Sequence, residues 1–469
     1  MKSFFRTLPP PVRLGLTTGS LVLVGLFLGF GWGFPAVLAA YLTLGLLSLA
    51  PPAPRWKLTA LALLTLEATL GLSVKLGGDL LFIALVGVLV LLLRLPTVPV
   101  WTKVLLGAAV LLIGIPVAGF ANTFLFELGI QIGIYSAMAL GLNVVVGMAG
   151  LLDMGYAAFF AIGAYTWAIF GSTQAAQFLS GWVPLNGNFA YLFMGFAILA
   201  TATTGILIGL PALRLRGDYL AIVTLGLGEV VRILANNLDH PLNLTNGPQG
   251  ISGIVKPPID GFQALLDIVG IPRSQATDHQ LFFYLLVLVI IGIVILVNVN
   301  LSRSKFGRAW VALREDEIAA KAMGIPMVKT KLIAFATGAA FSGAMGVLFA
   351  AQRGFVSPET FTLTASITIL GMVVLGGMGS VPGVILGAAA LTILNLDLLK
   401  SFSEFLNTLR QNDTVFLGFN FKTLPSQVDP AKYERLVFGV ILILMMIFRP
   451  EGLIPERRHQ LEEHGGVSK

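Results

Sequence analysis

The residue types that carry out most enzyme chemistry are scarce in this chain. Its 469 residues include no cysteine and four histidines, and all four lie in polar stretches: His240, His279, His459 and His464. The sequence therefore offers no thiolate nucleophile, no sulfur-ligated metal site and no histidine inside an apolar segment. It also lacks the phosphate-binding pattern G-x-x-x-x-G-K-[ST], so it has no such loop for ATP. We expect no catalytic residue, no metal and no cofactor bound by this chain.

Four ionisable residues lie within or near long apolar stretches: Glu67, Glu127, Glu229 and Arg232. A charge at the centre of a membrane helix costs about 2.5–3.5 kcal/mol, so each of these residues needs a reason to be there. Glu229 and Arg232 are three positions apart, and on a helix they can neutralise each other. The structural interpretation is such a pair. The functional alternative places Glu229 on a translocation path.

Composition predicts the setting of these residues. The chain is 56% hydrophobic and 11% charged, and its mean hydropathy is +0.88. One water-soluble core cannot bury so much apolar surface. We expect an all-α, polytopic integral membrane protein with about 12–14 membrane segments, including short or re-entrant helices.

Charge predicts the orientation of the segments. If the N-terminus is inside and every apolar run crosses, 20 of the 30 lysines and arginines fall on the cytoplasmic face, as the positive-inside rule requires. Both termini are then cytoplasmic, in a bacterial inner membrane. The loop 300–331 faces the cytosol. The polar segments 235–280 and 400–432 face outward, either as surfaces for an external partner or as ordinary connections.

The sequence divides into three parts. Residues 1–120 are Leu-rich and predict an N-terminal extension of about five helices. Residues 124–455 form the working core, because glycines and polar residues become frequent inside its apolar stretches, and 456–469 form a cytoplasmic tail. Small residues recur there at every fourth position, which favours close helix packing over the alternative of a substrate path. They are Gly129, Gly133, Ala137 and Gly141, and again Gly338, Ser342 and Gly346.

Two apolar stretches of the core are broken by glycine clusters. Glycine frees backbone groups that neighbours or a wet cavity must satisfy, and matching breaks in two parts of a transporter are typical of the translocation path. The alternative is a plain turn between two helices. The candidate path residues are Asn143, Gly147, Gly150 and Asp153 in the first break, Gly376, Gly377 and Gly379 in the second, and Glu229.

The cytosolic loop contains the most specific local pattern. Its residues Arg314, Glu315, Asp316 and Glu317 predict the start of a short helix, with acids in the first turn that suit the helix dipole. Ala319 and Ala320 give this helix a small apolar surface, and Gly324 predicts its end. Such a helix can dock in the groove of a soluble partner, or it can lie on the lipid headgroups.

The stretch EIAAKAMG, from Glu317 to Gly324, resembles the coupling loop of ABC importer permeases. Other stretches are similar to the branched-chain amino acid (Liv-type) permeases, and more to the LivM-like branch than to the LivH-like branch. They include GLNVVVGMAGLLDMGYAAFFAIGAY from Gly141, LPALRLRGDYLAIVTLGLGEVVRILANNLD from Leu210, GRAWVALREDEIAAKAMGI from Gly307, and RPEGLIP from Arg449. The resemblance covers about residues 124–455.

The resemblance implies the permease subunit of an ATP-driven importer for branched-chain or other hydrophobic or neutral amino acids. Such a subunit pairs with a second, related permease and with two cytosolic ATPase subunits, which bind ATP and Mg. It receives substrate from a separate binding protein and works by alternating access. By carry-over, the ATPase contact comprises Arg314, Glu315, Asp316, Glu317, Ala319, Ala320 and Gly324. The alternative is an ion-coupled secondary transporter, for which Glu127 and Glu229 are the only candidate relays.

Overall fold

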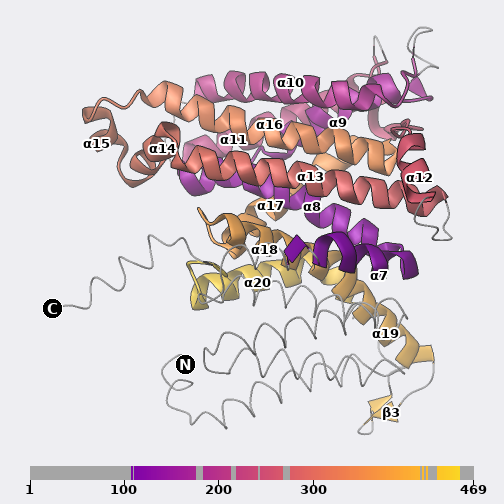
Figure 1. Ribbon diagram of the computed structural model, residues 1–469. Helices are drawn as coiled ribbons and strands as arrows, with labels where there is room; N and C mark the ends of the chain where they lie inside the picture. Colours follow the sequence, from indigo (N-terminus) through magenta and orange to yellow (C-terminus); the bar gives the residue numbers. More distant parts are fainter. Residues whose placement is uncertain are drawn as a thin grey trace. The chain divides into compact units, whose positions relative to one another are not determined.

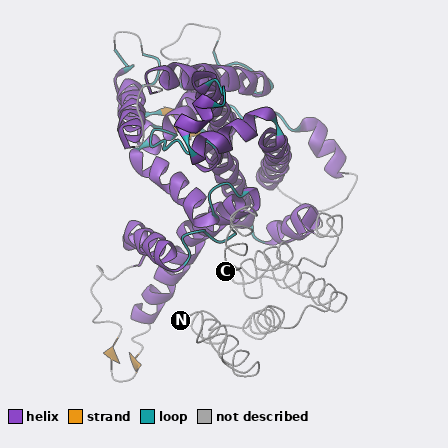
Figure 2. Cartoon of the chain, turned by 90° about the vertical axis from the view of Figure 1, so that its left-hand side faces the viewer, coloured by secondary structure: helices purple, strands orange, loops and turns teal. Residues whose placement is uncertain are grey.

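The computed structural model is mainly helical (Figure 1), with a few two-residue strands (Figure 2). It describes residues 107–108, 110–175, 183–212, 218–240, 243–267, 275–411, 415–416, 419–420 and 430–454. Most of the expected N-terminal extension, up to residue 106, and the expected tail 456–469 lie outside the described residues.

Six of the described helical segments are long and apolar enough to cross a membrane. They are Phe124–Met148, Phe189–Leu210, Tyr219–Asn237, Thr277–Arg303, Met327–Arg353 and Val381–Ser401, and two shorter apolar helices are Ala157–Gly171 and Leu363–Gly376. The prediction of an all-α, multi-pass membrane protein is therefore confirmed.

The α-helices are α7 (Ile115–Ala121), α8 (Phe124–Asn143), α9 (Ala157–Gly171), α10 (Phe189–Ala212), α11 (Asp218–Asn237), α12 (Asp260–Asp267), α13 (Gln275–Arg303), α14 (Lys305–Glu315), α15 (Glu317–Ala322), α16 (Met327–Arg353), α17 (Leu363–Gly376), α18 (Val381–Ile393), α19 (Leu399–Gln411) and α20 (Glu434–Phe448). Three π-helical turns are η1 (Val110–Gly114), η2 (Val144–Met148) and η6 (Leu394–Leu398). The 3₁₀ turns are η4 (Gly247–Gln249), η5 (Pro358–Phe361) and η9 (Pro430–Tyr433). The strands are β1 (Ile251–Ser252), β2 (Phe355–Val356), β3 (Val415–Phe416) and β4 (Phe419–Asn420).

Several helices are longer than their apolar runs. In the sequence, an apolar run covers residues 281–297, and α13 extends beyond both of its ends. Another apolar run covers 332–351, and α16 begins five residues before it, at Met327. Hydropathy marks only the part of a helix that suits hydrocarbon, whereas the backbone continues to hydrogen-bond until a capping residue ends it. Much of the loop predicted over 300–331 is consequently helical.

The chain forms two compact units. One comprises residues 1–130, 266–285 and 393–434, and the other comprises 131–265, 286–392 and 435–469. Within the first unit, the Tyr284 ring packs against Gly129, and the Tyr284 hydroxyl donates to the Leu111 carbonyl oxygen at 2.9 Å. The candidate coupling and path residues of the described core lie in the second unit, whereas Glu127 lies in the first.

Close helix packing holds the second unit together. Helices α9, α10 and α16 pack against one another. A Cβ atom added at Gly338 of α16 would lie 2.9 Å from the Gly141 carbonyl oxygen of α8. One added at Gly346 would lie 2.5 Å from the Ala164 nitrogen of α9. The prediction that these small residues let backbones approach closely is confirmed at both positions.

The connections of the second unit gather in two groups. In one group, β1 pairs antiparallel with β2, and the Val255 amide donates to the Gly171 carbonyl oxygen at 2.7 Å. In the other group, α14 and α15 lie with the two glycine clusters and with the segment 449–454. The first group includes β1 from the segment 235–280 and the second includes α14 and α15 from the loop 300–331, so the charge pattern predicts opposite faces of the membrane for the two groups.

Candidate functional site

The short helix predicted in the loop 300–331 is in fact divided between two helices. Ser304 caps α14, because its side-chain oxygen accepts from the Phe306 and Gly307 amides. Asp316 has an extended backbone and caps α15, since its Oδ1 accepts from the Ile318 amide at 2.8 Å. The expectation that one helix begins at Arg314 is therefore wrong. Arg314 and Glu315 end α14, and Asp316 supplies the cap that separates the helices.

The end of α15 is as predicted. Gly324 has a φ of +81°, and the Ile325 amide donates back to the Ala320 carbonyl oxygen at 3.1 Å. A left-handed residue at this position favours glycine. Ile318 and Met323 are 70% and 83% exposed, whereas Ala320 is 4% exposed. The free surface of the knob, defined here as residues 316–324, is thus more apolar than its alanines alone indicate.

A buried ion pair ties the knob to a membrane helix. The Lys331 Nζ atom lies 2.8 Å from Glu317 Oε1, and the Lys331 side chain is only 5% exposed. A buried charge needs a partner, so the position of Glu317 is fixed to the first turns of α16. Sequence reasoning missed Lys331, because it is 14 residues from Glu317 and across a turn.

Arg314 points from the loop into the protein. Its Nη1 atom donates to the Gly147 carbonyl oxygen of η2 at 2.6 Å. Its side chain also fills the space over Gly150, where an added Cβ would lie 2.8 Å from Arg314 Cγ. Trp310 of α14 is fully buried and donates to the Thr330 carbonyl oxygen at 2.8 Å. The loop is therefore packed onto the first glycine cluster.

The two glycine clusters meet. Asn143 Oδ1 accepts from the Gly379 amide at 2.8 Å, although the two residues are 236 positions apart. A Cβ atom added at Gly147 would lie 2.6 Å from the Gly379 nitrogen. Close backbone contact is the reason that glycine is needed at Gly147. The sequence predicted matching breaks, and the structure brings them into direct contact.

Each glycine cluster lies where one helix ends and the next is reached, and in the first cluster Gly147 is in the last turn of η2 and Gly150 in the link to α9. Gly377 and Gly379 have φ values of +114° and +85°, which link α17 to α18. A Cβ atom at Gly376 would lie 2.3 Å from the Gly383 carbonyl oxygen, so the two helices touch through their backbones. The Leu453 amide donates to the Leu375 carbonyl oxygen at 2.9 Å. The turn interpretation is confirmed, and a role in translocation stays a prediction.

Asp153 carries a buried carboxyl group in the segment 149–156, which connects η2 to α9. Oδ1 accepts from the Gly155 amide at 2.9 Å, and within the described part of the chain Oδ2 has no hydrogen-bond partner. Burial raises the pKa of Asp153 to about 6, and its hydrogen bond from the Gly155 amide opposes that rise only in part. A buried polar group with an unsatisfied atom is unusual in a stable structure and is typical of functional positions.

Replacing Asp153 with asparagine should stabilise the protein at neutral pH. Because burial raises the folded-state pKa from 3.8 to about 6, the protonated acid stabilises the fold fully below pH ~4, and this contribution is lost as the pH rises through 6. Near pH 7 the ionised form costs roughly 3 kcal/mol, which the asparagine avoids. Thermal unfolding in detergent across this pH range is the measurement. A gain that does not shrink towards pH ~4 contradicts the argument.

Glu229 and Arg232 form the predicted pair on α11. The Arg232 Nε atom donates to Glu229 Oε1 at 2.9 Å, and its Nη1 atom donates to Glu359 Oε1 of η5 at 3.0 Å. Glu359 was not foreseen, because it is 127 residues away. The structural interpretation of the pair is confirmed. Glu127 lies in the first turn of α8, and Glu67 lies outside the described residues.

The arrangement is suited to transmitting motion. Within the described ranges, no three His, Asp or Glu side chains are placed to hold a metal ion. A surface knob, a buried ion pair and an arginine connect the loop to two turns between membrane helices. Movement of the knob would therefore reach α16 and the glycine turns directly.

Comparison of the sequence with known proteins shows which family the chain resembles. The model of the family described as branched-chain amino acid transport system / permease component matches residues 124–446. The high-affinity branched-chain amino acid transport system permease protein LivM of Salmonella typhimurium is 41% identical over 347 residues, which are 72% of this chain and 71% of that protein. LivM of Escherichia coli shows the same identity and coverage. LivH of Escherichia coli is 22% identical over 70% of this chain and 93% of that protein.

No solved structure matches the chain. The family match covers more than half of the sequence and includes the loop, the glycine clusters and most of α20. The chain therefore belongs to the family of permease components of branched-chain amino acid transport systems.

Proposed function

We propose that this chain is the membrane permease subunit of an ATP-driven ABC importer for branched-chain or other hydrophobic or neutral amino acids. The knob of residues 316–324 carries the proposal. It is a short, exposed helix, and its ion pair from Glu317 to Lys331 fixes it to a spanning helix. The relatives named as branched-chain amino acid permeases support the substrate class.

The permease works with partners that supply energy and substrate. Two cytosolic ATPase subunits bind ATP and Mg, and one of them receives the exposed side chains of Ile318, Ala319 and Met323. A second permease of the same family completes the membrane part, and a separate binding protein delivers the amino acid. The existence of LivM and LivH as two permease proteins supports the pairing.

ATP-driven closure of the ATPase subunits moves the knob, and the core helices switch from outward-open to inward-open. The glycine turns around Gly147 and Gly379 are the place where this motion reaches the path. In this proposal the chain lies in the inner membrane, with both termini and the loop 300–331 in the cytosol. The distribution of lysine and arginine and the grouping of the connections support this orientation.

Uptake by the reconstituted complex tests the proposal. We expect proteoliposomes that contain the permease pair, with ATPase subunits and ATP in the lumen, to take up radiolabelled leucine when the binding protein is added outside. Excess isoleucine or valine should compete, whereas urea or a simple amide should not. Leucine uptake that needs a proton gradient but no ATPase would identify an ion-coupled transporter instead.

Replacing Glu229 with glutamine should lower uptake several-fold at unchanged protein level. The substitution removes the carboxylate that Arg232 pairs with on its own helix and leaves it only the exposed Glu359, within a spanning segment where a charge is unfavourable. Leucine uptake per molecule of inserted permease is the measurement.

Glu359→Gln is the matched control, because it removes the other carboxylate of Arg232, which is 66% exposed and lies outside the spanning segments. We expect uptake by this variant to stay near that of the wild type. Unchanged uptake in Glu229→Gln would leave only the structural role for the pair.

A further inference from the structure

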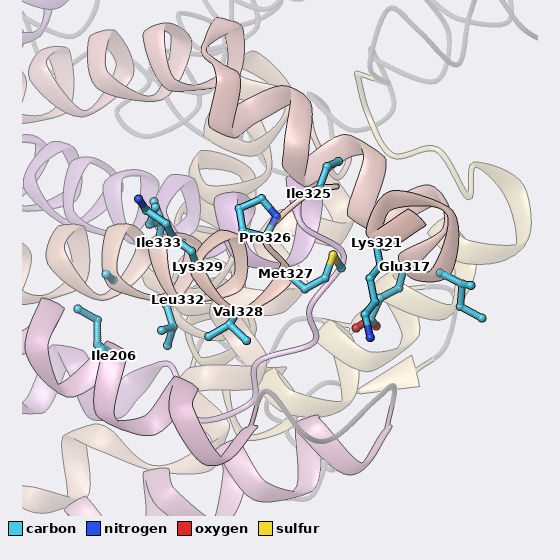
Figure 3. Close-up of a pocket in the computed structure, with 12 residues that line it drawn as sticks. Ile206, Glu317, Lys321, Ile325, Pro326, Met327, Val328, Lys329, Leu332 and Ile333 are labelled. Atoms are coloured by element: carbon cyan, nitrogen blue, oxygen red, sulfur yellow. The ribbon is translucent and has the colours of Figure 1, made fainter. Parts of the chain in front are cut away.

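A cavity of about 1120 Å³ lies beside the knob, between α15, α16 and the end of α10 (Figure 3). Nine of its twelve lining residues are apolar, and the other three are charged. Figure 3 shows Glu317 and Lys321 together at one end of the cavity, with Ile206, Leu332 and Lys329 toward the other. Lys329 therefore lies beside the apolar side chains and away from Lys321.

The apolar end of the cavity lies at membrane depth. Ile206 belongs to the spanning segment Phe189–Leu210, while Leu332 and Ala336 belong to the spanning segment Met327–Arg353. Ile206 is 40% exposed, and the neighbouring Leu207 of α10 is 61% exposed. This end of α10 presents apolar side chains outward, so the cavity opens where acyl chains of the bilayer would contact the protein.

The lining of the cavity carries a net positive charge. Glu317 is neutralised by Lys331 at 2.8 Å. Lys321 and Lys329 are exposed, and neither forms an ion pair with the part of the chain that the structure describes. The two lysines thus carry the net charge of the lining, Lys321 on the knob and Lys329 in the first turn of the spanning segment Met327–Arg353.

We propose that this cavity binds an anionic phospholipid of the cytoplasmic leaflet. The phosphate pairs with Lys329, and an acyl chain lies along Ile206 and Leu332. Basic pockets between membrane helices on the cytoplasmic side suit lipid headgroups, and that leaflet is rich in anionic lipid. The site requires the membrane orientation given above but not the importer function.

The lining favours a lipid over other ligands. A soluble ATPase cannot reach Leu332 and Ala336, because both lie inside a membrane span. A free amino acid is much smaller than the cavity, whose volume of about 1120 Å³ exceeds the ~300–1,000 Å³ of pockets for drug-sized ligands. A bound phospholipid would fill the space between α15 and α16 and so support the position of the knob.

Native mass spectrometry of the full-length permease, purified with its partner subunits in detergent, tests the site. The complex is titrated with phosphatidylglycerol and, separately, with phosphatidylcholine. We expect retention of phosphatidylglycerol over phosphatidylcholine. The variant Lys329→Gln should bind phosphatidylglycerol about fivefold more weakly, since a lysine near an anionic headgroup contributes about a factor of five.

The matched control is Lys305→Gln, which removes one exposed positive charge from α14, away from the cavity. This control should bind phosphatidylglycerol like the wild type. Equal weakening in both variants would mean that the lipid is held by general surface attraction and not by this site. Equal retention of the two lipids, or displacement of phosphatidylglycerol by excess inorganic phosphate, would overturn the proposal.

Discussion

An aspartate in place of Ala319 is expected to reduce both uptake and binding-protein-stimulated ATP hydrolysis by at least about tenfold. Ala319 lies on the exposed side of α15, between Ile318 and the buried Ala320. A carboxylate there would have to lose water, without a partner, at the centre of the proposed interface with the ATPase subunit. Leucine uptake and phosphate release from the same proteoliposomes measure the two effects.

The folding of the permease should be unaffected by this change. The Ala319 amide is held by Asp316 at 3.1 Å, and that hydrogen bond does not involve the side chain. Ser302→Asp is the matched control, because Ser302 is exposed on the same loop but lies outside the knob. Normal ATP hydrolysis and uptake in Ala319→Asp would remove the docking role of the knob.

Ala319 is a sharper test than its neighbour. Ala320 is 4% exposed and lies on the inner side of α15. An aspartate at Ala320 would bury a charge inside the permease, so a loss of activity there would report on the stability of the knob. The pair of substitutions separates docking from local folding, because the same side chain is added on opposite sides of one short helix.

The sequence predicted those features of the fold that repeat along the chain. Hydropathy located the spanning helices, because the apolar length of each is set by the bilayer. Residues four positions apart, such as Gly338 and Ser342, predicted close packing, since their spacing alone puts them on one helix face. Gly324 predicted the end of α15, because few other residues adopt a left-handed backbone.

Contacts between distant segments were not predictable in the same way. Nothing in the local sequence indicates that Asn143 accepts from Gly379, or that Lys331 pairs with Glu317. These contacts depend on how helices pack, which a single sequence does not encode as a pattern. The split between α14 and α15 was missed because Asp316 looks like any acid of a first helical turn, and only its extended backbone makes it a cap.

The alanines of the knob show a further limit. A helix of six residues has fewer than two turns, so its apolar residues have no measurable period. The sequence therefore could not separate the exposed Ala319 from the buried Ala320. It also could not show that Arg314 turns inward, since arginine in a cytosolic loop usually faces water or a partner.

Replacing Arg314 with glutamine is expected to lower leucine uptake at least tenfold while ATP hydrolysis stays near the wild-type rate. The exposed surface of the knob is unchanged, so the ATPase subunits still dock. The 2.6 Å hydrogen bond from Arg314 to the Gly147 carbonyl oxygen is lost, and with it a rigid connection from the loop to the glycine turns. The ratio of leucine transported to ATP hydrolysed is the measurement.

Arg308→Gln is the control for Arg314→Gln, because it removes an exposed arginine from α14 that donates to the Arg303 carbonyl oxygen within the loop.

The connection between the loop and the glycine turns can also be disturbed from its other side by Gly147→Ala. The added Cβ would lie 2.6 Å from the Gly379 nitrogen and must push the turns apart. Gly226→Ala is its counterpart, with nothing within 4 Å of the added atom. If Arg314→Gln and Gly147→Ala both uncouple hydrolysis from uptake, motion passes from α14 to the glycine turns. If Arg314→Gln instead lowers hydrolysis and uptake together, as Ala319→Asp should, Arg314 acts in docking and the inward path is wrong.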